Sequence, residues 1–359
     1  MIGFLCTTPY HLLISLSMAL NEFHREDKIL VVFGRFSDAD ILCERIRSLN
    51  IFVGVILLDS HDFDCLKNWN RRFRMFYFYK KFSNISKSVI FDQFIFFAPD
   101  LLEVSFMVKK IVKYSPNCKF SFAEDGIGSY LTPLIYEPTY KMQKWLKILH
   151  RDIFLKKITG LFLLHPELIA YQTSYHLQKI LPLDLLNSNF DAAIKNIWKK
   201  NNLVETDLLF LQQPFHEDHK IELAQKQNEL LDSIIRYCSS RHKKLGVKLH
   251  PRTRLFPYEN QCNIIDANDM YELEIKDSKA VKCIIGINSG ALLTPFLLWE
   301  KTIPIIFLYK LCGIKSLNSS MNHFLILFKE NYEKKGGRFY VPSNYDELFA
   351  ILKDVSNGD

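Results

Sequence analysis

Four short segments of the sequence combine side chains suited to acid, base or anion chemistry with the glycine and proline residues of turns. Each follows a run of apolar residues and therefore reads as the polar loop after a buried strand. Their chemistry differs: paired carboxylates in the first, a dense set of titratable groups in the second, an imidazole among cations in the third, and hydroxyl and backbone donors in the fourth. In chain order they are residues 121–130, 211–219, 248–252 and 284–293.

The first segment places two adjacent carboxylates, Glu124 and Asp125, before Gly126. One carboxylate is suited to act as general base on a hydroxyl group, while its neighbour hydrogen-bonds the same ligand or raises the pKa of its partner. Gly126 allows the tight turn that such a pair needs. An ordinary turn with acidic caps has the same composition, and the spacing alone does not decide between the two interpretations.

The third segment surrounds His250 with two cations, Lys248 and Arg252, and Pro251 ends the strand at the preceding residue. An imidazole with neighbouring cations suits a phosphate group, which it can neutralise, orient or protonate. A histidine at a strand end in a polar turn is the alternative interpretation.

The fourth segment reads as a strand, a turn of small residues that contains Asn288, Ser289 and Gly290, and a helix. Backbone N–H groups at a helix start, together with a serine hydroxyl, form an anion site, although a purely structural turn has the same pattern. The segment is neither a Walker A loop nor a G-x-G-x-x-G motif, which disfavours ATP and NAD. In the second segment, Glu217 or His216 is a further candidate base, with a solvated loop as the alternative.

The elements that would position these segments alternate between short apolar strands and amphipathic helices. This alternation predicts an α/β protein with parallel sheets covered by helices. The pattern weakens between residues 181 and 206 and then restarts, which predicts two Rossmann-like domains facing a central cleft. We expect an N-terminal domain over residues 1–190, a second domain over residues 205–335 and a closing helix over residues 340–359.

The composition is that of a globular protein with a moderate basic excess. A net charge of +7 suits an anionic partner such as a nucleotide, a phospholipid surface or a nucleic acid. Two segments, residues 71–81 and 141–157, mix cations with apolar residues, so that either can rest on an anionic membrane or form the solvated face of a surface helix. The sequence has no recognisable nucleic-acid-binding motif.

The eight cysteines are scattered, with no C-x-x-C pair and no histidine at metal-ligand spacing, which predicts reduced thiols and no metal site. The first residues lack the features of a secretory signal, and no segment reaches the roughly 18 uninterrupted apolar residues of a membrane span. We therefore expect a soluble cytoplasmic protein, with peripheral contact at the inner membrane face left open.

Taken together and in this order, the motifs resemble those of the bacterial sialyltransferases. The similarity is to the lipooligosaccharide sialyltransferases (glycosyltransferase family 52), with the capsular-polysaccharide sialyltransferases as relatives. It rests on CTTP after the first strand, FAEDG, LQQP, KLHPR and INSGALL, which span residues 2–293. The resemblance implies a GT-B fold, a CMP-sialic acid donor, inversion at the anomeric carbon and no metal or other cofactor.

The resemblance also implies a donor site in the second domain. His250 would contact the CMP phosphate and assist its departure, and Ser289 and Gly290 would hold the same phosphate. Pro251 and Asn288 would also belong to the donor site. An acid between these two motifs would contact the donor ribose, and three residues qualify: Asp266, Asp269 and Glu272.

Two positions compete for the role of the base. Asp125 is the base if the D/E-D/E-G motif supplies it, with Glu124 and Gly126 on the acceptor side. In the lipooligosaccharide branch the base follows the strand–Pro segment, where Glu217 is the nearest acid in this chain. The assignment stays open between Asp125 and Glu217.

The expected reaction is transfer of sialic acid from CMP-sialic acid to a hydroxyl group of a bacterial lipooligosaccharide or capsule, with galactose as the first candidate acceptor. The first alternative is a transferase of the same fold with a UDP-sugar donor. The second is a non-catalytic protein that binds anionic lipid or nucleic acid. The partners would then be a nucleotide-sugar donor and a glycan acceptor, and the sequence leaves open whether the chain forms a homodimer.

Overall fold

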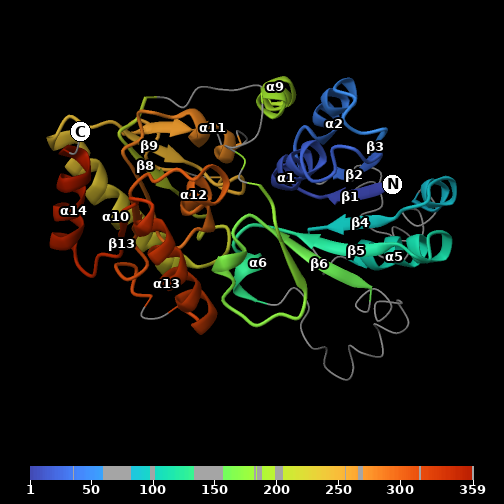
Figure 1. The fold of residues 1–359 in the computed structure, drawn as a ribbon. Coiled ribbons are helices and arrows are strands. Elements are labelled where there is room, and N and C mark those ends of the chain that lie inside the picture. Colours follow the sequence, from blue (N-terminus) through green and yellow to red (C-terminus); the bar gives the residue numbers. More distant parts are fainter. Residues whose placement is uncertain are drawn as a thin grey trace. The chain divides into compact units, whose positions relative to one another are not determined.

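The computed structural model describes residues 1–34, 36–59, 82–97, 102–132, 157–181, 183, 188–198, 205–254, 256–265, 270–314 and 317–357. The chain divides into two units, Met1–Lys199 and Lys200–Asp359. Each unit is a parallel sheet with helices packed against it (Figure 1). The predicted α/β class with parallel sheets is confirmed.

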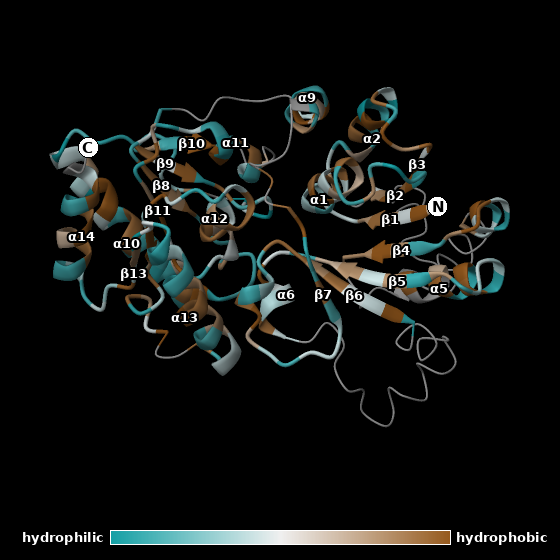
Figure 2. Ribbon diagram, viewed as in Figure 1, coloured by the Kyte–Doolittle hydropathy of each residue, from teal (hydrophilic) through white to brown (hydrophobic). Residues whose placement is uncertain are grey.

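Unit 1 is built on a seven-stranded sheet in the order β3-β2-β1-β4-β5-β6-β7. The central strands β1 and β4 are buried almost along their whole length and appear apolar in Figure 2, as expected of parallel strands covered on both faces. The strands are β1 (Ile2–Cys6), β2 (Lys28–Gly34), β3 (Gly54–Asp59), β4 (Gln93–Phe96), β5 (Lys119–Ala123), β6 (Ile158–Leu163) and β7 (His176–Lys179).

The helices of unit 1 include α9, which packs against α1 and α2. A hydrogen bond of 2.7 Å from Arg45 Nη1 of α2 to the carbonyl oxygen of Ile197 ties α9 to the same face. The expected domain end at residue 190 falls inside α9, whereas unit 1 runs to Lys199. The helices are α1 (Pro9–Leu20), α2 (Ala39–Ser48), α5 (Leu102–Tyr114), α6 (Gly128–Leu131), the 3₁₀ turn η1 (Pro166–Leu168) and α9 (Ser188–Ile197).

Unit 2 is built on a six-stranded parallel sheet in the order β10-β9-β8-β11-β12-β13. Its strands are β8 (Leu208–Leu211), β9 (Leu245–Lys248), β10 (Asn263–Ile265), β11 (Cys283–Gly286), β12 (Ile305–Phe307) and β13 (Phe339–Tyr340). Its helices are α10 (Ile221–Ser240), α11 (Tyr271–Asp277), η3 (Gly290–Leu292), α12 (Thr294–Trp299), α13 (Ser319–Lys334) and α14 (Tyr345–Asn357).

The last helix, α14, belongs to the body of unit 2. Its residues Leu348, Leu352 and Val355 lie in the same buried cluster as Leu230 and Ile234 of α10. Burial of this apolar face fixes the helix against the sheet through the hydrophobic effect. The predicted closing helix is therefore part of the second core.

Both sheets reverse their strand order at one place, between β1 and β4 in unit 1 and between β8 and β11 in unit 2. In open parallel sheets, ligands bind outside the carboxyl ends of the strands at such a point. The loops after β1 and β5 carry residues 7–11 and 124–126, and the loops after β8, β9 and β11 carry residues 212–219, 249–254 and 287–290. The four segments singled out in the sequence therefore lie at the carboxyl ends of their sheets.

The cysteines that the structure describes are free thiols, and most of them are buried. Burial raises the pKa of Cys118 and of Cys238 to about 12. A thiol with such a pKa stays protonated at neutral pH and is a poor nucleophile.

The close approach of β1 to β4 predicts that Gly3→Ala lowers the free energy of unfolding by about 1–3 kcal/mol, because a methyl group at Gly3 would overlap the ring of Phe94. Gly54→Ala in β3 is the control, since a methyl group there meets Ile29 Cγ1 at an ordinary 3.7 Å. The control should be neutral or stabilising by up to about 1 kcal/mol. Urea unfolding measures both, and equal stabilities of the two variants would contradict the packing described here.

Candidate active site

Glu124, at the carboxyl end of β5, is a buried carboxyl group with both oxygens engaged. Its Oε1 accepts a hydrogen bond of 2.8 Å from Tyr10 Oη, and its Oε2 accepts hydrogen bonds from Tyr130 Oη and, at 2.9 Å, from the backbone N–H of Leu164. Burial raises the pKa of Glu124, and the three donors oppose that shift. Glu124 was expected to contact an acceptor. Its side chain is fully buried and instead links the loops around the site.

Asp125, the next residue, faces solvent with 44% of its side chain exposed. Its Oδ1 lies 2.6 Å from Nε2 of His11, and its backbone N–H donates to Ser129 Oγ at 2.8 Å. Gly126 follows with a φ of +69°, a left-handed conformation that favours glycine and turns the chain into α6. Among the described residues, Oδ2 of Asp125 has no hydrogen-bond partner, so this oxygen is available to a ligand.

His11, in the first turn of α1, holds the carboxylate of Asp125 in place. Its ring is 1% exposed and stacks on Phe97, with the ring centres 4.4 Å apart and 13° between the planes. The backbone N–H of Thr7 donates to Nδ1 at 3.2 Å. Since a backbone N–H can only donate, Nδ1 accepts, and the hydrogen-bond network assigns the proton of the neutral ring to Nε2. His11 therefore donates to Asp125.

The sequence analysis did not identify His11. The CTTP motif ends two residues before it, and a histidine in an apolar helix reads as part of the core. A usable signal was present, because the chain places a polar ring in the first turn of the helix that follows the central strand, where loops carry ligands.

His250 lies in the loop after β9 and is half-buried. Its backbone N–H donates to Gln212 Oε1 at 3.2 Å, and its Nδ1 accepts from the backbone N–H of Arg252 at 3.1 Å. Burial lowers the pKa of His250, the charge of Arg252 lowers it further, and Asp218 and Glu217 oppose the shift. The imidazole is therefore neutral at neutral pH, with its proton on Nε2.

The cations beside His250 are paired with carboxylates. Lys248 Nζ lies 3.4 Å from Oε2 of Glu274, and both side chains are buried. The guanidinium of Arg252 contacts Asp218 through both of its terminal nitrogens, at 2.5 and 3.3 Å. Pro251, the other residue of this motif, is exposed. Both cations of KLHPR are therefore partly neutralised by carboxylates, and His250 Nε2–H is the neutral donor of this motif.

The turn after β11 presents Asn288, Ser289 and Gly290 beside the loop after β8. Ser289 Oγ accepts from the backbone N–H of Ala291 at 3.3 Å, which leaves its hydroxyl proton for a ligand. The backbone N–H of Asn288 donates to Gln213 Oε1 at 3.3 Å, and Asn288 Oδ1 is a buried oxygen with no partner among the described residues. The expected helix start is a short 3₁₀ turn, η3, and α12 begins only at Thr294.

Glu217, the second candidate base, is engaged by the loop after β9. Its Oε1 accepts from the backbone N–H of Arg254 at 2.8 Å. Burial acts to raise the pKa of Glu217, but the backbone N–H groups of Arg254 and Glu217 outweigh it, and the pKa is lowered. His216, beside it, is exposed. A carboxylate stabilised in this way is a weaker base than an unconstrained one.

Of the three acids predicted to contact the ribose, the structure describes one. Glu272 lies in the first turn of α11, where burial raises its pKa and the charge of Lys248 opposes the shift. Asp266 and Asp269 lie outside the described residues, as do residues 71–81 and nearly all of 141–157, the segments considered for membrane contact. No helix in the described ranges is both long and apolar enough to cross a bilayer. Within the same ranges, no three His, Cys, Asp or Glu side chains gather as a metal site.

Comparison with known families gives a match over most of the chain. The alpha-2,8-polysialyltransferase (POLYST) family matches residues 4–302. The chain belongs to this family. That membership makes it a sialyltransferase and confirms the resemblance to sialyltransferases found in the motifs. No curated protein matches the sequence.

Solved structures are similar in fold at low sequence identity. The alpha/beta-galactoside alpha-2,3-sialyltransferase of Photobacterium phosphoreum is 12% identical with a TM-score of 0.54, over 94% of this chain and 97% of that one. UGT89C1 of Arabidopsis thaliana is 11% identical with a TM-score of 0.52, over 99% of this chain and 90% of that one. The fold of this polysialyltransferase-family chain is therefore that of the GT-B glycosyltransferases, as predicted.

The contrast between the two neighbouring carboxyl groups predicts unequal losses of stability when each is removed. Glu124→Ala should lower the free energy of unfolding by about 3 kcal/mol or more, because it leaves Tyr10 Oη, Tyr130 Oη and the Leu164 N–H without an acceptor. Asp125→Ala, the matched comparison, should lower it by less, about 1–2 kcal/mol, because it leaves one buried donor, His11 Nε2–H, without an acceptor. Denaturant unfolding at pH 7 measures both, and equal losses would show that Glu124 is not the structural member of the pair.

Proposed function

We propose that this chain is an inverting, metal-independent sialyltransferase that uses CMP-sialic acid and acts on a hydroxyl group of a bacterial surface glycan. The observation that carries the proposal is the hydrogen bond from buried His11 to half-exposed Asp125 at the carboxyl edge of unit 1. A carboxylate held in one orientation, with one oxygen free, is what removal of a proton from a sugar hydroxyl requires.

Asp125 is the better base of the two candidates. Its Oδ1 is held by His11, whose ring stacks on Phe97 and accepts at Nδ1 from the backbone N–H of Thr7. Its Oδ2 has no partner among the described residues, and the side chain is 44% exposed. Glu217 is instead bound to the backbone of Arg254 and has a lowered pKa. We therefore assign the base to Asp125 in this proposal.

The proposed step replaces one C–O bond of the anomeric carbon by another and transfers one proton. The hydroxyl oxygen of the acceptor attacks the anomeric carbon of sialic acid, while the bond from that carbon to the phosphate oxygen of CMP breaks and takes its electron pair to CMP. The hydroxyl proton passes to Asp125. Attack from the face opposite the leaving group inverts the anomeric carbon, through a transition state that resembles an oxocarbenium ion.

Unit 2 supplies neutral hydrogen-bond donors suited to the departing phosphate. His250 presents Nε2–H and Ser289 presents its hydroxyl proton, and both are oriented by backbone N–H groups that occupy their acceptor sites. Preorganised donors of this kind stabilise charge that develops in a transition state. CMP has a single phosphate, so that there is no diphosphate for a metal ion to bridge. The acid that contacts the ribose stays a prediction, with Glu272 as the candidate that the structure describes.

Direct analysis of the product tests this function. Wild-type protein, CMP-sialic acid, lactose and excess EDTA should give sialyllactose, detected by mass spectrometry, and CMP should raise the Tm of the protein while UDP does not. UDP-glucose is the control donor. Transfer from UDP-glucose, with CMP-sialic acid untouched and no effect of CMP on the Tm, would overturn the proposal in favour of a UDP-sugar transferase.

A double-mutant cycle tests the roles of Asp125 and His11. Asp125→Asn should lower kcat by about 10²–10⁴-fold, because the base is lost. His11→Gln should lower kcat by about tenfold or more while the affinity for CMP is unchanged, because the base is then poorly oriented. The double variant should be no slower than Asp125→Asn alone, since His11 acts only through the carboxylate.

The matched control for this cycle is His24→Gln, an exposed histidine of the same unit. Its kcat should be that of the wild type. A merely structural role for His11 would show as losses that multiply in the double variant, accompanied by a lower Tm of His11→Gln.

A further inference from the structure

The loop that joins β6 to β7 lies against the turn that carries Asp125, and the proposed mechanism gives this loop no role. Tyr171 Oη donates to the carbonyl oxygen of Ser129 at 3.1 Å. The backbone N–H of Ala170 donates to the carbonyl oxygen of Tyr130 at 2.9 Å. Both acceptors belong to α6, which begins three residues after Asp125. Hydrogen bonds from two consecutive residues therefore fix the loop beside the turn.

Ser129 connects Tyr171 to the candidate base. Its Oγ accepts from the backbone N–H of Asp125 at 2.8 Å, and its carbonyl oxygen accepts from Tyr171. Ser129 itself is buried, so both hydrogen bonds are shielded from water. The ring of Tyr171 is thus held two hydrogen bonds away from Asp125, and all of these groups belong to unit 1.

The turn between Asp125 and Ser129 has an open face. A methyl group added at Gly126 or at Gly128 would meet no atom of the described residues within 4 Å. The side chain of Asp125 is 44% exposed at the start of the same turn, and its Oδ2 has no partner among the described residues. Space for a ligand is therefore present directly beside the candidate base.

Tyr171 offers the face of its ring to a ligand in this space. Both Tyr171 and Tyr175 are partly exposed. Burial raises the pKa of Tyr171 to about 12, and nearby Tyr175 adds to the shift, so the phenol is protonated at neutral pH. Its proton is donated to Ser129. The C–H groups of a pyranose ring pack on aromatic rings, and a tyrosine ring fixed by its hydroxyl group suits this contact.

We propose that Tyr171 positions the acceptor. The sugar ring whose hydroxyl group loses its proton to Asp125 packs on the ring of Tyr171 and over the open face at Gly126 and Gly128. This contact holds the hydroxyl group against Oδ2 of Asp125. The inference rests on the proposed function, because it requires Asp125 to receive the acceptor proton. It assigns a ring contact that a neutral hexose and a sialic acid can both make.

Two substitutions of Tyr171 separate its ring from its hydroxyl group. Tyr171→Ala should raise the KM for the acceptor by about tenfold, the size expected for a lost ring contact. Tyr171→Phe should keep this KM within about threefold, because the ring remains. The KM for CMP-sialic acid should be unchanged in both. If Tyr171 only ties the loop to α6, both variants lose the same hydrogen bond and should be equally impaired, and that result would overturn the proposal.

Saturation-transfer NMR makes the test independent of turnover. With CMP present and no sialic acid donor, the wild type and Tyr171→Phe should show contact to the ring protons of the acceptor, and Tyr171→Ala should not. The probes are lactose and an α-2,8-linked sialic acid trimer. Absence of contact in the wild type with both probes would overturn the proposal.

Substitutions of Gly128 test the open face separately. Gly128 lies in α6 and, unlike Gly126, has no left-handed φ, so its backbone accommodates a side chain. Gly128→Ala should keep the acceptor KM of the wild type. Gly128→Leu should raise it by about tenfold or more at an unchanged Tm, because the side chain fills the space proposed for the sugar ring. Equal KM values for the two variants would contradict the proposed position of the acceptor.

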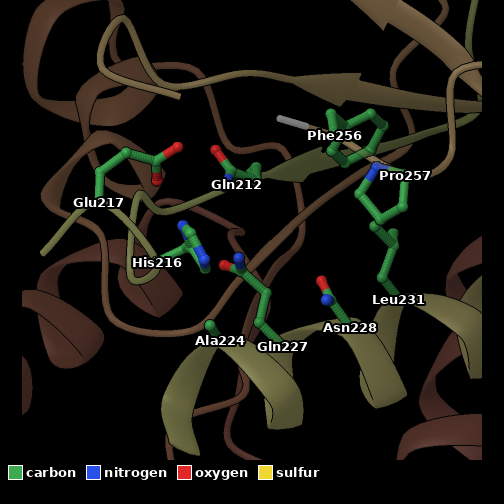
Figure 3. Close-up of a pocket in the computed structure, with 9 residues that line it drawn as sticks. All are labelled: Gln212, His216, Glu217, Ala224, Gln227, Asn228, Leu231, Phe256 and Pro257. Carbon is green, nitrogen blue, oxygen red and sulfur yellow. The ribbon is translucent and has the colours of Figure 1, made fainter. Parts of the chain in front are cut away.

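A pocket of unit 2 is the competing place for the acceptor. It has a volume of about 350 Å³, and Phe256 contributes an aromatic ring to its lining (Figure 3). Phe256→Ala should leave the acceptor KM unchanged, as should Tyr345→Ala, a control whose residue is 39% exposed on α14. A raised acceptor KM in Phe256→Ala but not in Tyr171→Ala would overturn the proposal in favour of the pocket.

The proposed function fails by a different result. A wild type that neither consumes CMP-sialic acid nor gains Tm from CMP would refute it, and neither measurement needs an acceptor. A wild type that passes both tests, with Tyr171 and Gly128 variants that keep its acceptor KM, would refute the acceptor contact alone.

Discussion

The buried carboxyl group of Glu124 is the constraint on which the candidate base depends. Donors from three elements converge on its two oxygens: Tyr10 from α1, Tyr130 from α6 and the backbone of Leu164 beyond β6. A buried carboxyl group costs free energy unless its oxygens are hydrogen-bonded, so these elements pack favourably only in the arrangement that supplies all three donors. Asp125 is the next residue, so the hydrogen bonds of Glu124 also fix the position of its backbone. Its side chain can then remain exposed and reactive without having to stabilise the fold.

In unit 2, uncharged amide side chains hold the loops at the carboxyl end of the sheet in place. Gln213, which follows β8, exchanges two hydrogen bonds with Gln227 through its backbone and accepts from the Asn288 N–H through its side chain. Gln212 holds the backbone of His250 in the same way. An amide donates and accepts at once, so that two consecutive glutamines cross-link the loops after β8, β9 and β11. These amide cross-links add no charge of their own, whereas a carboxylate in the same role would add a further negative charge close to where a phosphate is expected.

Much of the fold could be predicted from the sequence, because it rests on local patterns. The apolar runs that became β1, β5, β8, β9 and β11, and the polar loops after them, were visible from hydropathy alone. Hydrogen bonds and ion pairs between residues far apart in the sequence could not be predicted in this way. His11 and Asp125 are 114 residues apart, and nothing local marks that hydrogen bond. The ion pair of Lys248 with Glu274 of α11 likewise joins different elements, and the sequence around Lys248 gives no sign of it. Glu124 and Asp125 are adjacent acids whose opposite burial depends on side-chain direction at a strand end, which composition does not encode.

His11 and His250 have the same hydrogen bond at Nδ1. In each, a backbone N–H occupies Nδ1, from Thr7 at His11 and from Arg252 at His250, which leaves the proton on Nε2. At His11 that proton is directed to Oδ1 of Asp125, and the hydrogen bond orients the side chain of Asp125. At His250 the same tautomer leaves an N–H with no partner in the described structure, beside cations that are already paired. A cation at this place would attract the phosphate in the ground state as well as in the transition state. A neutral donor binds the ground-state phosphate less strongly and still stabilises the charge that develops as CMP departs. In these loops the backbone thus sets the tautomer, and the tautomer sets whether an imidazole positions a base or faces a leaving group.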